Sequence, residues 1–152
     1  MQQLSPKARF DALASVLSFD SASVDSIRHS ISHLLKDVSE LVRMVDVAMK
    51  SEGTLDVFGD VGEGTREKMQ SLLASFIMRT INCNYDEEYC NYAVDVSSAS
   101  DVPPNLFAVG LTIANEYVTQ TLPASVDNTE QLTGMLSAWN RLTCILRELT
   151  RK

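Results

Sequence analysis

Apolar residues recur every three or four positions through almost the whole chain, which is the spacing of amphipathic helices. The longest such run before the midpoint extends from about Ala22 to Lys50 and predicts one continuous helix with a wide apolar stripe. Two further long runs close the chain, from Pro103 to Leu122 and from Asn128 to the last residue. The pattern predicts an all-α domain of about six to eight helices, with no convincing strand.

Residues that commonly begin and end helices separate these runs. Ser5 followed by Pro6 is typical of a helix start, because proline is well tolerated at the first helical position. Asp86 and Asn128 precede apolar runs and are expected to act as N-caps. Pro123 is expected to lie just past the end of its helix.

The last two predicted helices are long enough to shape the whole molecule. At about 1.5 Å per residue, each would span about 30 Å. An antiparallel pair of this length can associate with a second copy of itself as a four-helix bundle. We therefore expect a homodimer, with an interface formed by apolar residues of these two helices: Leu111, Val118, Leu132, Leu136, Trp139 and Leu146.

Length, charge and hydropathy narrow the class of protein. The 152 residues are enough for one domain with its own core, covering residues 1–152. A helix that crosses a bilayer needs about 20 apolar residues, and no apolar run here comes close to that length. Because the first residues also lack the layout of a signal peptide, we expect a cytoplasmic location. The net charge of −7 would repel phosphate backbones, which argues against nucleic acid as a partner.

Few residues suggest metal binding or catalysis. His29 and His33 are four residues apart on one predicted helix, but a solvated helix face explains that spacing as well as a metal site does. Cys83, Cys90 and Cys144 are odd in number and show no metal-binding spacing. We expect no metal site, and we expect the protein not to be an enzyme, because no nucleophile with an activating neighbour is visible.

Nearly the whole chain, from about Ser18 to Lys152, resembles the sensor globins, and the most specific segment lies in its second half. It begins with Tyr-Asp-Glu-Glu-Tyr at Tyr85 to Tyr89 and continues to Val-Pro-Pro at Val102 to Pro104, where a long helix starts. These relatives comprise globin-coupled sensors, protoglobins and related haem-free domains of stress-signalling and sporulation-control proteins. The resemblance implies a globin-like fold, dimerisation through the last two helices, and a haem held by a histidine shortly before the Val-Pro-Pro start.

The expected histidine is missing from this chain. Counting forward from Tyr89 places it near Ser100, and counting back from Val102 places it near Ser97. A serine hydroxyl is a poor ligand for haem iron. The position of the family's gas-binding tyrosine also falls on apolar residues, at about Met44 and Val45. From these departures we predict that haem is unlikely and that the protein belongs to the haem-free branch.

The resulting prediction is a regulatory or signalling domain that binds a small, fatty-acid-like apolar ligand where relatives hold haem. A large void costs roughly 24 cal/mol per Å³, so side chains or a ligand must fill that space. Two alternatives remain open: a ligand-free interaction or dimerisation module serving a signalling partner or a fused output domain, and a haem-based gas sensor with an atypical iron ligand. The residues predicted to line the pocket are Leu41, Val45, Phe58, Leu73, Phe76, Tyr92, Val96 and Phe107.

Overall fold

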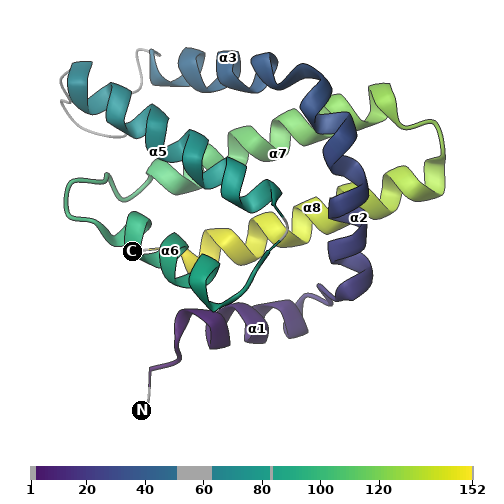
Figure 1. Ribbon diagram of the computed structural model, residues 1–152, viewed down its shortest axis with the longest axis horizontal. Coiled ribbons are helices and arrows are strands. Elements are labelled where there is room, and N and C mark those ends of the chain that lie inside the picture. Colours follow the sequence, from purple (N-terminus) through teal and green to yellow (C-terminus); the bar gives the residue numbers. More distant parts are fainter. Residues whose placement is uncertain (1–2, 51–62, 83, 152) are drawn as a thin grey trace.

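The computed structural model describes residues 3–50, 63–82 and 84–151 (Figure 1). Over these ranges the chain forms seven α-helices, one short 3₁₀ segment and no β-strand, which confirms the predicted all-α fold. The elements are α1 (Pro6–Val16), α2 (Ser21–Leu34), η1 (Leu35–Asp37), α3 (Val38–Met49), α5 (Glu63–Ile81), α6 (Glu87–Ser98), α7 (Leu106–Ser125) and α8 (Thr129–Leu149).

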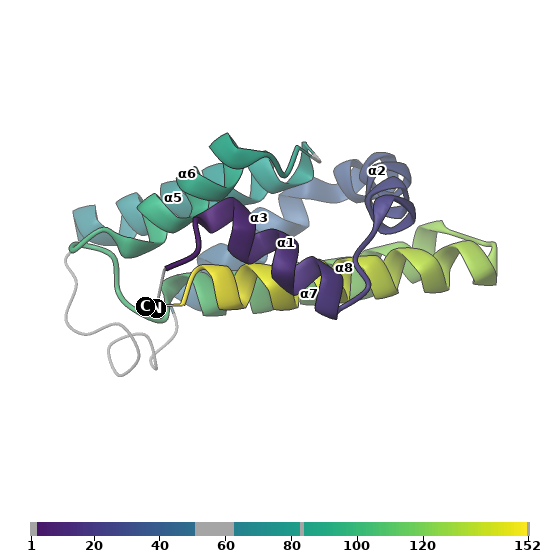
Figure 2. The same ribbon diagram turned by 90° about the horizontal axis from the view of Figure 1, so that it is seen from below.

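The two C-terminal helices form the base on which the other helices pack. Helices α7 and α8 run side by side and antiparallel, and they make up one layer of the molecule (Figures 1 and 2). Helix α2 crosses both of them, while α1 packs against α8 and α6. Helix α3 contacts α7 and α5, so that α3, α5, α7 and α8 surround the centre of the core.

Three helix starts lie at the capping residues that the sequence indicates. The Ser5 hydroxyl accepts a hydrogen bond from the Ala8 amide at 3.2 Å, with Pro6 at the first helical position. The Asp86 and Asn128 side chains each accept a bond at 2.9 Å from the amide three residues further on. These bonds satisfy amide groups that a helix leaves without an internal partner.

The prediction of one continuous helix from Ala22 to Lys50 is wrong. The chain bends at η1, between α2 and α3, so that α3 leaves the direction of α2 and packs against α5 and α7. At the bend, the Leu34 carbonyl accepts a hydrogen bond from the Tyr117 hydroxyl on α7. Contacts with distant helices therefore outweigh a local helical periodicity that runs through the bend.

Helix α7 is displaced toward the C-terminus relative to the prediction. It begins at Leu106 instead of Pro103, because Pro103 belongs to a turn in which its carbonyl accepts from the Leu106 amide at 3.1 Å. It ends at Ser125, with Pro123 inside the last turn rather than beyond it. A proline so close to a helix end removes only one backbone donor, and the Val126 amide still bonds the Leu122 carbonyl at 2.8 Å.

The two tyrosines of the recognised motif hold α5 and α6 together. The Tyr85 hydroxyl donates to the Thr80 carbonyl at 3.0 Å, and the Tyr89 hydroxyl lies 2.6 Å from the Thr80 hydroxyl. The Thr80 hydroxyl in turn lies within hydrogen-bonding distance of the Phe76 carbonyl, at 2.8 Å. All these residues are buried, so the bonds satisfy polar groups that would otherwise lose hydration on folding.

Candidate functional site

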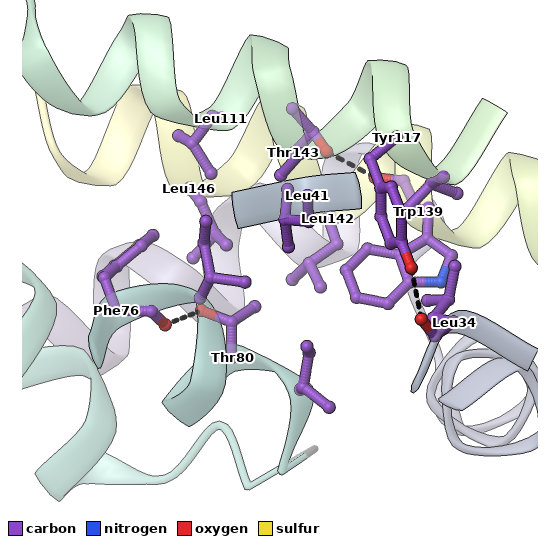
Figure 3. Close-up of a pocket in the computed structure, with 14 residues that line it drawn as sticks. Leu34, Leu41, Phe76, Thr80, Leu111, Tyr117, Trp139, Leu142, Thr143 and Leu146 are labelled. Carbon is purple, nitrogen blue, oxygen red and sulfur yellow. Dashed lines mark hydrogen bonds between the residues drawn. The ribbon is translucent and has the colours of Figure 1, made fainter. Parts of the chain in front are cut away.

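A small apolar cavity lies at the centre of the core, between α3, α5, α7 and α8 (Figure 3). Its volume is about 40 Å³, which is close to the space of one or two water molecules. Leu41 contributes from α3 and Phe76 from α5, while Leu111 and Leu146 come from α7 and α8. The cavity therefore offers apolar contacts to whatever enters it.

The polar groups around this cavity are engaged with the surrounding helices. The Thr143 hydroxyl donates to the Trp139 carbonyl at 2.8 Å, and the Tyr117 hydroxyl donates to the Leu34 carbonyl (Figure 3). The Trp139 indole N–H donates to the Ser30 hydroxyl at 2.8 Å. Burial raises the pKa of the Tyr117 phenol above its ordinary value, so that the hydroxyl keeps its donor proton further into the alkaline range.

A larger groove runs along the outside of the cavity, between α3 and α5. Its volume of about 690 Å³ lies in the range of small-molecule sites. Val42 on α3 and Met78 on α5 line it and remain 64% and 49% exposed. Leu41 and Ile77 line both the groove and the cavity, so these two side chains form the wall between them.

Charged side chains stand around the groove on α3. The Arg43 guanidinium donates two hydrogen bonds to Glu40, at 2.9 and 2.5 Å, and this bonding lowers the pKa of the Glu40 carboxyl. Asp46 accepts from Lys50 at 3.0 Å and from Gln70 at 3.3 Å, and the Lys50 hydrogen bond is the main cause of its lowered pKa. Both carboxyl groups are therefore ionised at neutral pH.

The residues predicted to line a ligand pocket are spread over several places. Leu41 and Phe76 line the central cavity, and Leu41 and Val45 line the groove. Leu73 is buried at the crossing of α5 and α7, against Gly110. Only part of the predicted set thus comes together around one open space.

The remaining predicted pocket residues lie elsewhere. The Phe107 ring packs edge-on against Phe76 at 5.1 Å, and the Tyr92 ring lies under the Arg79 guanidinium at 3.9 Å. Val96 is half-buried on α6 and lines neither the cavity nor the groove, and Phe58 falls outside the described residues.

Of the residues predicted for a dimer interface, most are packed inside the chain itself. Leu111, Val118, Trp139 and Leu146 are at most 7% exposed, and all four line the central cavity. The other two, Leu132 and Leu136, are half-buried on α8 and pack partly against the core. Dimerisation stays a prediction, and Leu132 and Leu136 are the predicted residues with area left for a partner.

Sequence reasoning missed Ile77 and Tyr117 as parts of the site. In the sequence, Ile77 and Tyr117 differ in no way from the other apolar and aromatic residues that recur at helical spacing. A phenol within an otherwise apolar stripe does give a signal, because a buried tyrosine hydroxyl needs a partner. The identity of that partner, Leu34, depends on the bend between α2 and α3.

The fold and the apolar site at the centre of four helices define a globin-like helical domain. The chain belongs to the Protoglobin family, whose family model matches residues 6–150. No curated protein and no solved structure matched the chain. Membership in this family makes the protein a globin-type sensor domain.

The family corrects our prediction about the cofactor. Members of the Protoglobin family normally bind haem, so the prediction that haem is unlikely is wrong, and haem is the cofactor that the family implies. The absence of a histidine at Ser97 or Ser100 was too little to set haem aside.

In this packing, the described residues near those positions do not fit an iron ligand. The Ser97 hydroxyl is buried and donates to the Val94 carbonyl at 3.1 Å. Burial raises the pKa of the neighbouring Cys90 thiol to about 11, which disfavours the thiolate that binds iron. The Phe76 and Tyr89 rings stack at 6.4 Å between α5 and α6. The cavity of about 40 Å³ is also far smaller than a typical ligand pocket, which has a volume of roughly 300–1,000 Å³, so it has no room for haem in this packing.

The described residues show no group of three or more side chains that could hold a metal ion. The His33 imidazole lies 2.6 Å from the Ser125 hydroxyl, at the far end of α7, and lines neither the cavity nor the groove.

Among the helices that the structure describes, none is both long and apolar enough to cross a membrane.

Proposed function

We propose that this sensor domain detects a slender apolar ligand that lies in the groove between α3 and α5 and reaches toward the central cavity. The observation that carries the proposal is the shared wall of Leu41 and Ile77, which places an exposed apolar groove directly beside an internal apolar space. A binding module of this kind needs no catalytic group, so we propose a regulatory role rather than an enzymatic one.

The shape of the site favours a narrow chain. The groove has room for a small molecule, whereas the space behind Leu41 and Ile77 has room only for a group of the size of one or two methylenes. Filling that space with apolar atoms restores dispersion contacts that its lining side chains lack. A fatty-acyl type of chain combines both requirements.

The signal would leave through the C-terminal helices. Leu111, Trp139 and Leu146 line the cavity from α7 and α8, so a ligand that shifts these side chains acts directly on the two helices. We propose that a homodimer uses the outer side of this pair, with Leu132 and Leu136 at the contact. A cytoplasmic location remains part of this proposal.

A pair of neighbouring substitutions on α5 tests the site. Ala74 lines the groove, whereas the adjacent Ser75 is exposed and does not line it. Ala74→Trp should fill the groove and abolish the retention of an acyl chain, as measured by native mass spectrometry after incubation with long-chain fatty acids and alcohols. Ser75→Trp adds the same ring to the same helix and should leave retention unchanged. Equal retention by both variants would contradict the proposal.

Hemin is the competitor to include, because members of the family normally bind haem. Absorbance titration would show whether hemin binds saturably. Repeating the titration with protein that already holds an acyl chain would show whether hemin and the acyl chain compete. Saturable hemin binding that displaces the chain would overturn the proposed ligand in favour of the family's cofactor. Retention of the acyl chain by the protein in the presence of excess hemin would support the proposal.

A further inference from the structure

We propose that the ligand of the groove between α3 and α5 is a single-chain amphiphile whose headgroup carries no negative charge, such as a long-chain alcohol or a monoacylglycerol. This inference rests on the proposed function, because it concerns the chemistry of the ligand at that same groove. It differs from the sequence-based expectation of a fatty acid, whose carboxylate is ionised at neutral pH.

The apolar tail of such a ligand has a defined path. Val42 and Met78 line the groove and remain exposed, and Ala74 lines it with a side chain of a single methyl group, which takes up little of its volume. Leu41 and Ile77 are nearly buried and separate this part from the central cavity. A tail that lies against them is largely removed from water, which is the main source of affinity for an alkyl chain.

The charges beside the groove disfavour a carboxylate headgroup. Among the described residues that line the groove, Arg43 is the cationic one, and its guanidinium already donates two hydrogen bonds to Glu40. Asp46 and Glu67 also line the groove and bring two carboxylates. The Lys50 ammonium lies 3.0 Å from Asp46 and offsets its charge, so Glu67 is the carboxylate that contributes most to the local negative charge. An anionic headgroup would therefore meet a locally negative surface, on a chain whose net charge is −7.

An uncharged hydroxyl headgroup finds suitable partners at the same place. Ser39 on α3 and the pair Gln70 and Ser71 on α5 line the groove with two hydroxyls and one amide. A serine hydroxyl and a primary amide can both donate and accept, so they can bond an alcohol without a change in charge. Ser39 donates to Asp37 at 3.2 Å and its oxygen keeps acceptor capacity for a second bond.

The test compares two ligands with the same chain and different headgroups. Binding of dodecanol and of laurate is measured by equilibrium dialysis at pH 8, below the micelle-forming concentrations. Dodecanol should bind more tightly by roughly threefold or more, in line with the small energies of charge contacts at exposed sites. Trp139 lines the cavity and is the single tryptophan of the chain, so its emission reports whether the tail arrives there.

Charge reversal at the groove sharpens the comparison. Glu67→Lys should tighten laurate binding by roughly twofold to fivefold and change dodecanol binding by less than that, because dodecanol carries no charge. Asp95→Lys introduces the same charge on exposed α6, outside the groove, and should change neither ligand. Unfolding in urea confirms that both variants are folded.

The outcomes separate this inference from the function on which it rests. Laurate binding as tight as dodecanol binding, with no response to Glu67→Lys, would overturn the headgroup assignment while the proposed function stands. Failure of both ligands to bind the wild-type protein would overturn the proposed function itself. If the wild-type protein binds dodecanol more tightly than laurate, and Glu67→Lys reduces that difference while Asp95→Lys does not, the result would support both the headgroup assignment and the proposed function.

Discussion

The Tyr117 hydroxyl, in the second half of α7, donates a hydrogen bond to the main-chain carbonyl of Leu34 at the end of α2. A second bond joins α8 to the same helix α2, because the Trp139 indole donates to the Ser30 hydroxyl at 2.8 Å. Both aromatic side chains also line the central cavity. The wall of the cavity and the bend between α2 and α3 are therefore one connected structure.

Replacing Tyr117 by phenylalanine should destabilise the protein by about 1–3 kcal/mol, because it leaves the Leu34 carbonyl without this partner in the core. The measurement is the free energy of unfolding from urea denaturation. Tyr92→Phe is the matched control, since Tyr92 is only half-buried on α6 and should lose less than about 0.5 kcal/mol. Equal losses in the two variants would show that the Leu34 contact does not stabilise the bend.

Two glycines inside helices should respond differently to replacement by alanine. A Cβ at Gly110 would lie 2.4 Å from Leu73 Cδ2 at the buried crossing of α5 and α7, so Leu73 would have to move within a packed core. That overpacking costs roughly 1–3 kcal/mol and offsets the helix propensity gained. A Cβ at Gly134 meets only Ser26 Oγ at 3.6 Å, an ordinary contact.

Gly134→Ala should therefore raise the free energy of unfolding by about 0.5–1 kcal/mol, because alanine is the better helix former. Gly110→Ala should leave it unchanged or lower it by up to about 2 kcal/mol, and Leu73→Val in the same chain should recover part of the loss. Thermal or urea denaturation of the four proteins measures both. Stabilisation by Gly110→Ala as large as that by Gly134→Ala would disprove the close crossing.

Local patterns in the sequence predicted the helices, and distant contacts determined the rest. Ser5, Asp86 and Asn128 act within one helical turn, so their caps could be read from the chain alone. The bend after Leu34 could not, because its partner Tyr117 is 83 residues away. Apolar periodicity shows that a face is buried without showing what buries it.

Because apolar periodicity does not show which element covers a buried face, the predicted site residues were only partly right. Leu111 and Trp139 were assigned to a dimer interface, yet they line a cavity within their own chain. The predicted pocket followed the position of haem in relatives, whereas the space found here lies between α3, α5, α7 and α8. The apolar periodicity of α3 is enough to predict that Leu41 faces the core. Its position between the groove and the cavity depends on how α3 packs against α5, which the periodicity does not show.

The contact between Thr80 and Tyr89 should stabilise the corner between α5 and α6. Thr80→Val keeps the shape of the side chain and removes the hydroxyl that lies 2.6 Å from the Tyr89 hydroxyl. We expect a loss of about 1–2 kcal/mol in the free energy of unfolding, because a buried phenol loses its partner. Thr133→Val is the control, since its hydroxyl bonds the Thr129 carbonyl on the exposed side of α8. A loss no larger than that of Thr133→Val would contradict the role of this contact.

The buried Cys90 thiol should make the protein less stable at alkaline pH. Burial raises its pKa from 9.0 to about 11, with Lys7 opposing the shift and Asp11 and Asp86 adding to it. In the unfolded chain the thiol ionises from about pH 9, whereas the folded chain keeps the proton until about pH 11. The unfolded state therefore binds fewer protons over this interval, and the free energy of unfolding falls as the pH rises.

Urea denaturation between pH 8 and pH 11 measures this effect in the wild-type protein and in Cys90→Ala. The wild-type slope should be steeper by up to about 1.4 kcal/mol per pH unit, the value for one proton. Burial also raises the pKa of Tyr89, and the Cys90 charge adds a smaller part of that shift. The slopes of the two proteins are therefore compared below the ordinary tyrosine pKa of 10.0, where Tyr89 keeps its proton in the folded chain and largely in the unfolded one. Cys144→Ala changes an exposed thiol and should keep the wild-type slope. Parallel slopes in all three proteins would mean that the Cys90 thiol ionises as readily in the folded chain as in the unfolded one, and that α6 does not keep water from it.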